Sequence, residues 1–264
     1  MGLDIYFYTI KDKDKYHKYQ AARRKYDALY DEMYKKYKEP YDAACKKWHE
    51  WYEAETEKEI AASNNNQTYD INFNEAPRAE LTDFMTNVEA LEFNTASSEY
   101  NNLKNDLHID YDDNIEDLYM RKKNWMCKFV ETRHPELLTH ETKDYGKVLE
   151  NGEALLSRAD IEELVRRMRK VTENFKEYHD ICPDDWGENG WRSEGEMKWI
   201  EEWKPTDEMA NVAEQLLPGM SRFFYGSTAY DYYYFEGIKA YIDTFQEWLD
   251  EHEYSDCLLY EESW

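Results

Sequence analysis

The sequence predicts a mainly α fold of the α+β class, with a very small sheet that pairs an N-terminal strand with a C-terminal strand. Three observations predict it. Apolar residues recur at helical spacing over several long stretches, two short runs are rich in aromatic residues, and 16% of the 264 residues are aromatic. This aromatic content favours a folded chain over a disordered one, although the mean hydropathy is −1.02.

The chain begins with a strand signal. Residues 3–10 (LDIYFYTI) combine β-branched and aromatic residues, as a short buried strand does. A second apolar run at residues 221–225 is expected to pair with it, so that both chain ends join one core domain of residues 1–10 and 111–264. Residues 11–110 are predicted to form an inserted helical arm with an Asn-rich linker at 63–74.

The predicted arm is rich in tyrosine. Pro40 is expected to interrupt or kink its helix, because proline removes a backbone donor and clashes with the preceding turn. Two interpretations remain open: an aromatic seam packed on the rest of the fold, or a projecting antiparallel arm. The aromatic residues recur mostly at steps of three, four or seven, which places them on one helix stripe: Tyr19, Tyr26, Tyr30, Tyr34, Tyr37, Tyr41, Trp48 and Tyr52.

The remaining chain reads as helices separated by loops. Residues 75–107 are predicted to be irregular or weakly helical, and the acidic tail from residue 255 to be loosely held. A helix is predicted over 157–178, with Ser157 as N-cap and Asp160 in the reciprocal position. Further helices are predicted over 113–131, 194–203, 207–217 and 229–251, the last with Ser227 or Thr228 as its N-cap.

Composition excludes several classes of protein. With 58 acidic and 33 basic residues, the net charge of −25 opposes direct nucleic-acid binding and favours a partner with a basic surface. The sequence has no run of 18 apolar residues, so we expect no membrane span. We also expect no secretory signal, because the first residues lack a basic stretch followed by a long apolar one. We expect no metal and no cofactor, and reduced thiols in a cytoplasm, because there is no histidine metal motif and no CxxC pair among Cys45, Cys127, Cys182 and Cys257.

The most informative motif is RFFYGSTAYDYYYFEG at residues 222–237. A strand that runs through Gly-Ser-Thr into a helix presents free amides and hydroxyls at a positive helix end, which suits a small anionic ligand. The same residues also make an ordinary helix cap. Arg121 and Asn124 lie three residues apart on the helix predicted over 113–131, so they share one face of it. We expect both side chains to meet this turn. The candidate ligand-binding residues are therefore Arg121, Asn124, Gly226, Ser227, Thr228, Tyr230 and Asp231.

Three segments together resemble a known family. They are the opening MGLDIYFY, the segment YMRKKNWMCKF, and LLPGMSRFFYGSTAYDYYYFEGIKAYIDTFQEWL. The set is similar to a family of uncharacterised bacteriophage and mobile-element proteins with an MGLDMYL-type start, a YxRK-x-N core and an FFxGSTxYD motif near the C-terminus. The resemblance implies a phage or prophage accessory role in the cytoplasm of a host cell, and it implies no particular reaction.

Three functions follow as hypotheses. The first is a non-enzymatic, phage-type accessory protein that binds a host or defence component through an acidic or aromatic surface. The second is a binder or enzyme for a phosphorylated small molecule or nucleotide at the turn 226–231. The third is a structural protein that self-assembles through the tyrosine-rich helices. Whether the chain is an enzyme stays open at this point, with the non-enzymatic role favoured, since no catalytic motif identifies a catalytic residue.

Overall fold

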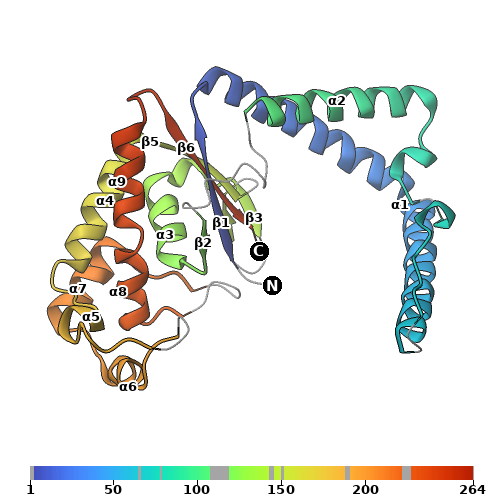
Figure 1. Cartoon of the computed structure of the whole chain (residues 1–264). Helices are drawn as coiled ribbons and strands as arrows, with labels where there is room; N and C mark the ends of the chain where they lie inside the picture. Colours follow the sequence, from blue (N-terminus) through green and yellow to red (C-terminus); the bar gives the residue numbers. More distant parts are fainter. Residues whose placement is uncertain are drawn as a thin grey trace. The chain divides into compact units, whose positions relative to one another are not determined.

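The computed structural model describes residues 3–64, 67–77, 79–107, 119–142, 146–149, 152–187, 191–221 and 227–263. The chain divides into two compact units, shown in Figure 1. Unit 1 comprises residues 1–13 and 108–264, and unit 2 comprises residues 14–107.

A four-stranded antiparallel sheet organises unit 1, with strand order β2-β1-β6-β5. The first and last strands of the sequence are its central pair, with a register that runs from Asp4↔Ser263 to Ile10↔Cys257. The predicted pairing of an N-terminal with a C-terminal strand is therefore confirmed. The strands are β1 (Asp4–Ile10), β2 (Met120–Arg121), β5 (Glu153–Ser157) and β6 (Cys257–Ser263).

The identity of the C-terminal strand corrects the sequence prediction. The segment predicted to be a loosely held tail is β6, and Leu258, Leu259 and Tyr260 are each 0% exposed. Burial of these three side chains outweighs the acidic residues around them. The expected strand at 221–225 lies outside the described residues, except for Ser221.

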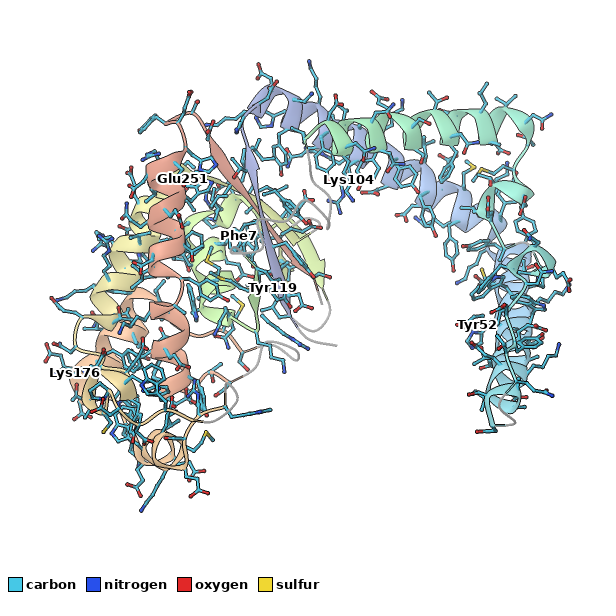
Figure 2. The ribbon with its side chains drawn as sticks, in the orientation of Figure 1. Phe7, Tyr52, Lys104, Tyr119, Lys176 and Glu251 are labelled. Atoms are coloured by element: carbon cyan, nitrogen blue, oxygen red, sulfur yellow. The ribbon has the colours of Figure 1, made fainter. Side chains whose placement is uncertain are left out.

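Helices cover one side of the sheet, as Figure 1 shows for α3, α4, α8 and α9. The Phe7 ring of β1, labelled in Figure 2, meets the ring of Phe245 in α9 at 5.5 Å and that of Tyr260 at 5.8 Å. The helices of unit 1 are α3 (Asn124–Arg133), α4 (Arg158–Thr172), α5 (Tyr178–Ile181), α6 (Glu194–Glu202), α7 (Asp207–Leu216), α8 (Tyr232–Lys239) and α9 (Ile242–Glu251). A 3-10 turn (Pro135–Leu137) and a separate hairpin of β3 (His140–Thr142) and β4 (Gly146–Val148) complete the described elements.

The start of α4 confirms its prediction. The Ser157 hydroxyl accepts a hydrogen bond from the Asp160 backbone N–H, and the Asp160 carboxylate accepts one from the Ser157 N–H. Two amides that would otherwise lack partners at the helix end are thereby satisfied. The apolar residues on the inner face of α4 are buried in the core: Ile161, Leu164, Val165, Met168 and Val171.

The predicted helix over 113–131 is wrong in its described first part. Residues 108–118 lie outside the description, and Met120–Arg121 forms β2 on the edge of β1. Lys122 then has φ of 55°, a left-handed conformation that a helix does not continue through, and α3 begins at Asn124. Arg121 and Asn124 therefore do not share a helix face.

Unit 2 is built on two long helices. The first, α1 (Lys13–Asn64), has 52 residues and contains Pro40. Of the two outcomes expected at Pro40, interruption and kink, the interruption is absent, and Figure 1 shows that the ribbon of α1 changes direction partway along. Between the helices lie two 3-10 turns, η1 (Phe73–Glu75) and η2 (Leu81–Phe84). The second long helix, α2 (Asn87–Asp106), has 20 residues in a region predicted to be irregular or weakly helical.

The tyrosine stripe of α1 packs against α2. Tyr100 stacks on Tyr19 and on Tyr26, each with ring centroids 5.6 Å apart, and Phe93 lies 5.3 Å from Tyr26. The stripe is thus an aromatic seam within unit 2, since α2 supplies its partners. Thr86 and Glu89 close a capping box at the start of α2, a Thr-x-x-Glu signal that the sequence carries.

Candidate functional site

The structure brings together two elements of the predicted ligand site. The Asn124 side-chain amide donates a hydrogen bond to the Ser227 carbonyl oxygen at 2.7 Å, and Asn124 is only 3% exposed. The Arg121 side chain lies at Asp4 of β1. Its Nε lies 3.7 Å from Asp4 Oδ1, and its side chain is 63% exposed. Gly226 lies outside the described residues.

The helix end that was expected to hold an anion carries a carboxylate of its own. The predicted single helix over 229–251 is α8 followed by α9, and the N-cap of α8 is Asp231 rather than Ser227 or Thr228. Asp231 Oδ1 accepts a hydrogen bond from the Tyr234 backbone N–H at 3.0 Å. This carboxylate occupies the position in which a bound anion would sit.

The other predicted residues of this turn make local contacts. The Ser227 hydroxyl accepts a hydrogen bond from the Ala229 backbone N–H at 3.1 Å, and the exposed Thr228 follows it. The half-buried Tyr230 ring meets Tyr234 edge-on at 5.0 Å, and burial raises the pKa of the Tyr230 phenol. These contacts order the entry to α8, and an anion site here stays a prediction.

A second surface of unit 1 exposes large aromatic side chains. Trp186 is 69% exposed, Trp191 80% and Tyr233 50%. We call these three residues the tryptophan patch. They come from the segment between α5 and α6 and from the first turn of α8. Aromatic rings present a large apolar area, and exposed apolar patches on a protein surface are typical of binding sites.

The underside of the patch is rigidly supported at Trp186. Its ring stacks on His179 with centroids 4.1 Å apart and an angle of 10° between the planes. His179 Nε2 lies 3.4 Å from the buried carboxylate of Glu196. One face of the Trp186 indole is thus held by protein, while the side chain as a whole stays open to solvent.

Arg192 supports the Tyr233 side of the patch. Its guanidinium lies over the Tyr232 and Tyr233 rings, 5.6 and 5.3 Å from their centroids. Arg192 Nη2 donates to both carboxylate oxygens of Glu236, at 2.7 and 2.8 Å. Arg192 Nε lies 3.7 Å from Glu196, so that one carboxylate links the two halves of the support.

The loop that carries the tryptophans is pinned at its base. Asp185 Oδ2 accepts hydrogen bonds from the Tyr178 hydroxyl at 2.5 Å and from the Ser193 hydroxyl at 2.9 Å. Gly187 allows the loop to close, because a Cβ there would lie 1.7 Å from the Trp191 carbonyl oxygen. A residue with a side chain at Gly187 would therefore displace Trp191.

The sequence around the patch is acidic. Residues 177–207 contain ten acidic and three basic residues. Indole faces attract cations, and carboxylates around them strengthen that attraction. The arrangement suits Lys or Arg side chains of a partner. Sequence analysis missed this surface, although four of the nine tryptophans fall within residues 180–205, a signal of unusual density.

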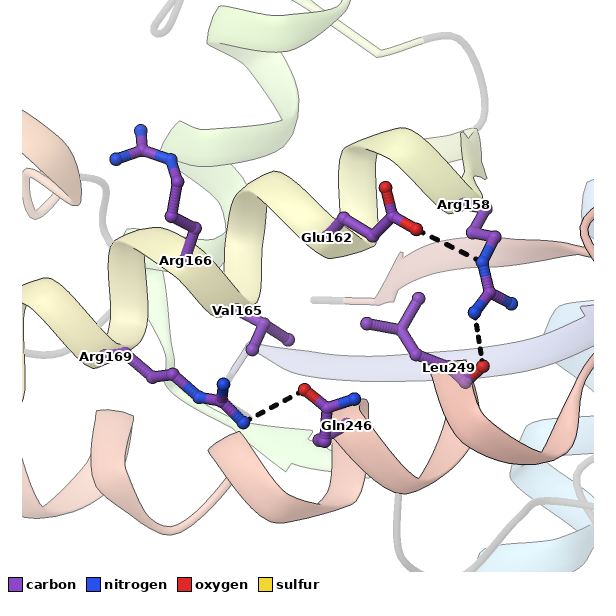
Figure 3. A pocket seen from close by; sticks show the side chains of 7 residues that line it. All are labelled: Arg158, Glu162, Val165, Arg166, Arg169, Gln246 and Leu249. Carbon is purple, nitrogen blue, oxygen red and sulfur yellow. Dashed lines mark hydrogen bonds and ion pairs between the residues drawn. The ribbon is translucent and has the colours of Figure 1, made fainter.

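A groove of about 330 Å³ lies between α4 and α9, and Figure 3 shows its arginines. Arg158 donates to the carbonyl oxygens of Leu249 at 2.5 Å and His252 at 2.9 Å, at the C-terminal end of α9. Arg169 donates to Gln246 at 2.9 Å. These contacts satisfy carbonyls at a negative helix end and hold α9 on α4, so they explain the arginines as structural.

Within the described ranges, no group of three or more His, Cys, Asp and Glu side chains is placed to hold a metal ion. None of the helices in that part of the chain combines the length and apolar character that a bilayer-spanning segment requires. No family model, curated protein or solved structure matches the chain.

Proposed function

We propose that the chain is a non-enzymatic binding protein that holds a basic segment of a partner protein on the tryptophan patch. One observation carries the proposal: Trp186 and Trp191 are 69% and 80% exposed on a loop whose base is fixed. Tryptophan is enriched among the residues that dominate binding energies at protein interfaces. The ring of Trp186 is already held against His179, so this side chain loses little conformational entropy on binding.

Charge supports a basic partner. The chain has a net charge of −25, and ten of its acidic residues lie at positions 177–207. Such a field accelerates association with a positively charged surface and repels phosphate backbones. The resemblance to bacteriophage and mobile-element proteins makes a host or defence protein in the host-cell cytoplasm the expected partner.

The test is to titrate the full chain with a synthetic Lys- and Arg-rich peptide and to measure binding by calorimetry. An acidic peptide of equal length is the negative control. We expect the basic peptide alone to bind, and binding to weaken as salt is added. The double substitution Trp186→Ala and Trp191→Ala should weaken binding about tenfold or more, since each tenfold corresponds to about 1.4 kcal/mol.

Tyr254→Ala is the matched control, because Tyr254 is 80% exposed but lies in the turn before β6. This variant should bind like the parent chain. Equal loss in both variants, or binding that the double substitution leaves unchanged, would refute the assignment of the patch. Absence of any binding to the basic peptide would refute the partner class.

A further inference from the structure

Lys123 has an unusual position at the junction of α3 and α8. It is the N-cap residue of α3, and its half-buried side chain reaches the backbone of α8 at Gly237. A Cβ on Gly237 would lie 2.4 Å from Lys123 Nζ, so the amine fills the space that the missing side chain leaves. The Tyr241 ring lies on the same side, 6.0 Å from Nζ.

No carboxylate neutralises this amine among the described residues. The acidic side chain of α8 that acts on it is Glu236, and that carboxylate is bound by Arg192 at 2.7 Å. Lys239, also on α8, provides the contrast: its Nζ lies 3.0 Å from Glu177 and 3.4 Å from Asp180. Within the described residues, Lys239 is held in ion pairs and Lys123 is not.

The two environments shift the pKa values of the two amines in opposite directions. Burial lowers the pKa of Lys123, and the charge of Glu236 opposes this only in part. For Lys239, burial also acts to lower the pKa, but the hydrogen bond to Glu177 and the charges of Glu177 and Asp180 outweigh it and raise the pKa. A larger share of Lys123 is therefore neutral, and the neutral amine is the nucleophile.

Two cations adjoin the amine in sequence. Arg121 and Lys122 are both exposed, in a chain that is otherwise strongly acidic, and Arg121 shares its charge with Asp4 at 3.7 Å. The charge of Lys122 favours the approach of an anionic reagent to this turn. An acyl phosphate combines a reactive acyl carbon with a negatively charged leaving group, so it matches both the amine and its cationic neighbours.

We propose that Lys123 is a site of Nε-acylation by acyl phosphates, independent of the binding function of the tryptophan patch. The Nζ lone pair attacks the acyl carbon and forms the C–N bond. The bond from that carbon to the phosphate oxygen breaks, and inorganic phosphate leaves with the electron pair. The amine proton passes to solvent. The product is a neutral amide, so the turn loses one positive charge.

The experiment treats the full chain with acetyl phosphate at about pH 8 and measures the acetylation rate at each lysine by mass spectrometry. Lys123 should react several-fold faster than Lys239, because its lowered pKa leaves a larger share of the amine neutral than the raised pKa of Lys239 does. Its rate should also level off at a lower pH than that of Lys239. Equal rates, or a slower rate at Lys123, would overturn the proposal.

Gly237→Ala supplies a variant that leaves Lys123 in place. The new methyl group must push the flexible amine away from α8 into water, while alanine suits the helix better than glycine. We expect the rate at Lys123 to fall toward that of Lys239, with an unchanged circular dichroism spectrum and an unchanged rate at the exposed Lys170. An unchanged rate at Lys123 would show that its seat on Gly237 does not set its reactivity.

Discussion

The two units of the chain are stabilised by different kinds of side chain. In unit 1, a continuous cluster of buried residues joins β1, β6 and the helices, and it includes Leu3, Phe7, Leu164 and Leu258 at 0 or 1% exposure. In unit 2, the helices meet through tyrosine rings, many of them half-buried, and through ion pairs such as Lys25–Glu99. Fully buried apolar area stabilises more than partly wet rings do. Unit 1 is therefore expected to be the more stable unit.

The largest effect is expected for Phe7→Ala in unit 1. The substitution removes a ring that contacts Phe245 and Tyr260, and such cavities cost about 4 kcal/mol. Hydrogen exchange followed by mass spectrometry should show protection lost across β1, β6 and α9, while α2 keeps its protection. Equal loss in α2 would mean that the two units unfold as one.

Phe93→Ala is the corresponding change in unit 2. Phe93 is 8% exposed and contacts the rings of Tyr26 and Tyr30, and Tyr30 is itself 36% exposed, so the space that Phe93 leaves adjoins water. We expect a loss of about 2 kcal/mol, below the usual range for a buried phenylalanine. Exchange should rise in α2 and in the facing part of α1. A cost equal to that of Phe7→Ala would remove the proposed difference between the units.

Asp160→Asn is expected to cost about 2 kcal/mol in unit 1, the value typical of hydrogen bonds to a charged group. Asp160 is buried, and its carboxylate accepts hydrogen bonds from Ser157 and from Arg133 at 2.7 to 3.0 Å. Burial acts to raise its pKa, but the hydrogen bonds from His134, Ser157 and Arg133 outweigh this and lower it. The measurement is urea unfolding at neutral pH, and Glu162→Gln, at an exposed position of α4, is the control.

The same substitution should change how stability depends on pH. His134 Nε2 lies 3.4 Å from Asp160 Oδ2, and this carboxylate raises the pKa of His134, so His134 stabilises the fold fully below about pH 6.5. This contribution disappears as the pH rises through the raised folded-state pKa. Asp160, whose pKa is lowered, contributes above about pH 3.9 and is lost as the pH falls. Unfolding midpoints measured from pH 6 to 9 should therefore decline less steeply in Asp160→Asn, and an unchanged slope would exclude the His134 pairing.

The smallest effect is expected for Thr86→Ala at the start of α2. Loss of the N-cap should cost about 1 kcal/mol and raise exchange only in the first turn of the helix. Glu89 accepts hydrogen bonds from Lys36, Thr86 and Tyr37, which lower its pKa to about 2. Its contribution is lost as the pH falls through this range, and the variant should show a weaker acid dependence. A response that spreads over all of unit 2 would show that its helices unfold together.

Local sequence signals predicted the parts of the fold that depend only on residues close together in the sequence. Ser157 and Asp160 define the start of α4 because a cap needs only neighbouring residues. β6 was missed because its four apolar residues stand among acidic ones, and only pairing with β1 on one side and β5 on the other buries them. The same holds for Met120–Arg121, whose strand conformation depends on β1. Propensity yields to tertiary pairing in these segments.

The candidate site was only partly within reach of sequence analysis. The contact between Asn124 and Ser227 joins two predicted residues, but Arg121 and Asp231 serve the edge of the sheet and the cap of α8. The tryptophan patch depends on His179 and Glu196 meeting beneath Trp186, which no spacing encodes. The high density of tryptophans can be seen in the sequence. That two of them are exposed to solvent can be seen only in the structure.

The central place of β6 in the sheet bears on how the protein is made. β1 is synthesised well before its main partner β6, so the sheet cannot close until residues 257–263 have been made. Until then one edge of β1 has no partner strand, while the helices of unit 2, which lie between the two strands in the sequence, can already pack on each other. A chain that is stalled or cut before β6 would therefore expose an open strand edge to chaperones and proteases.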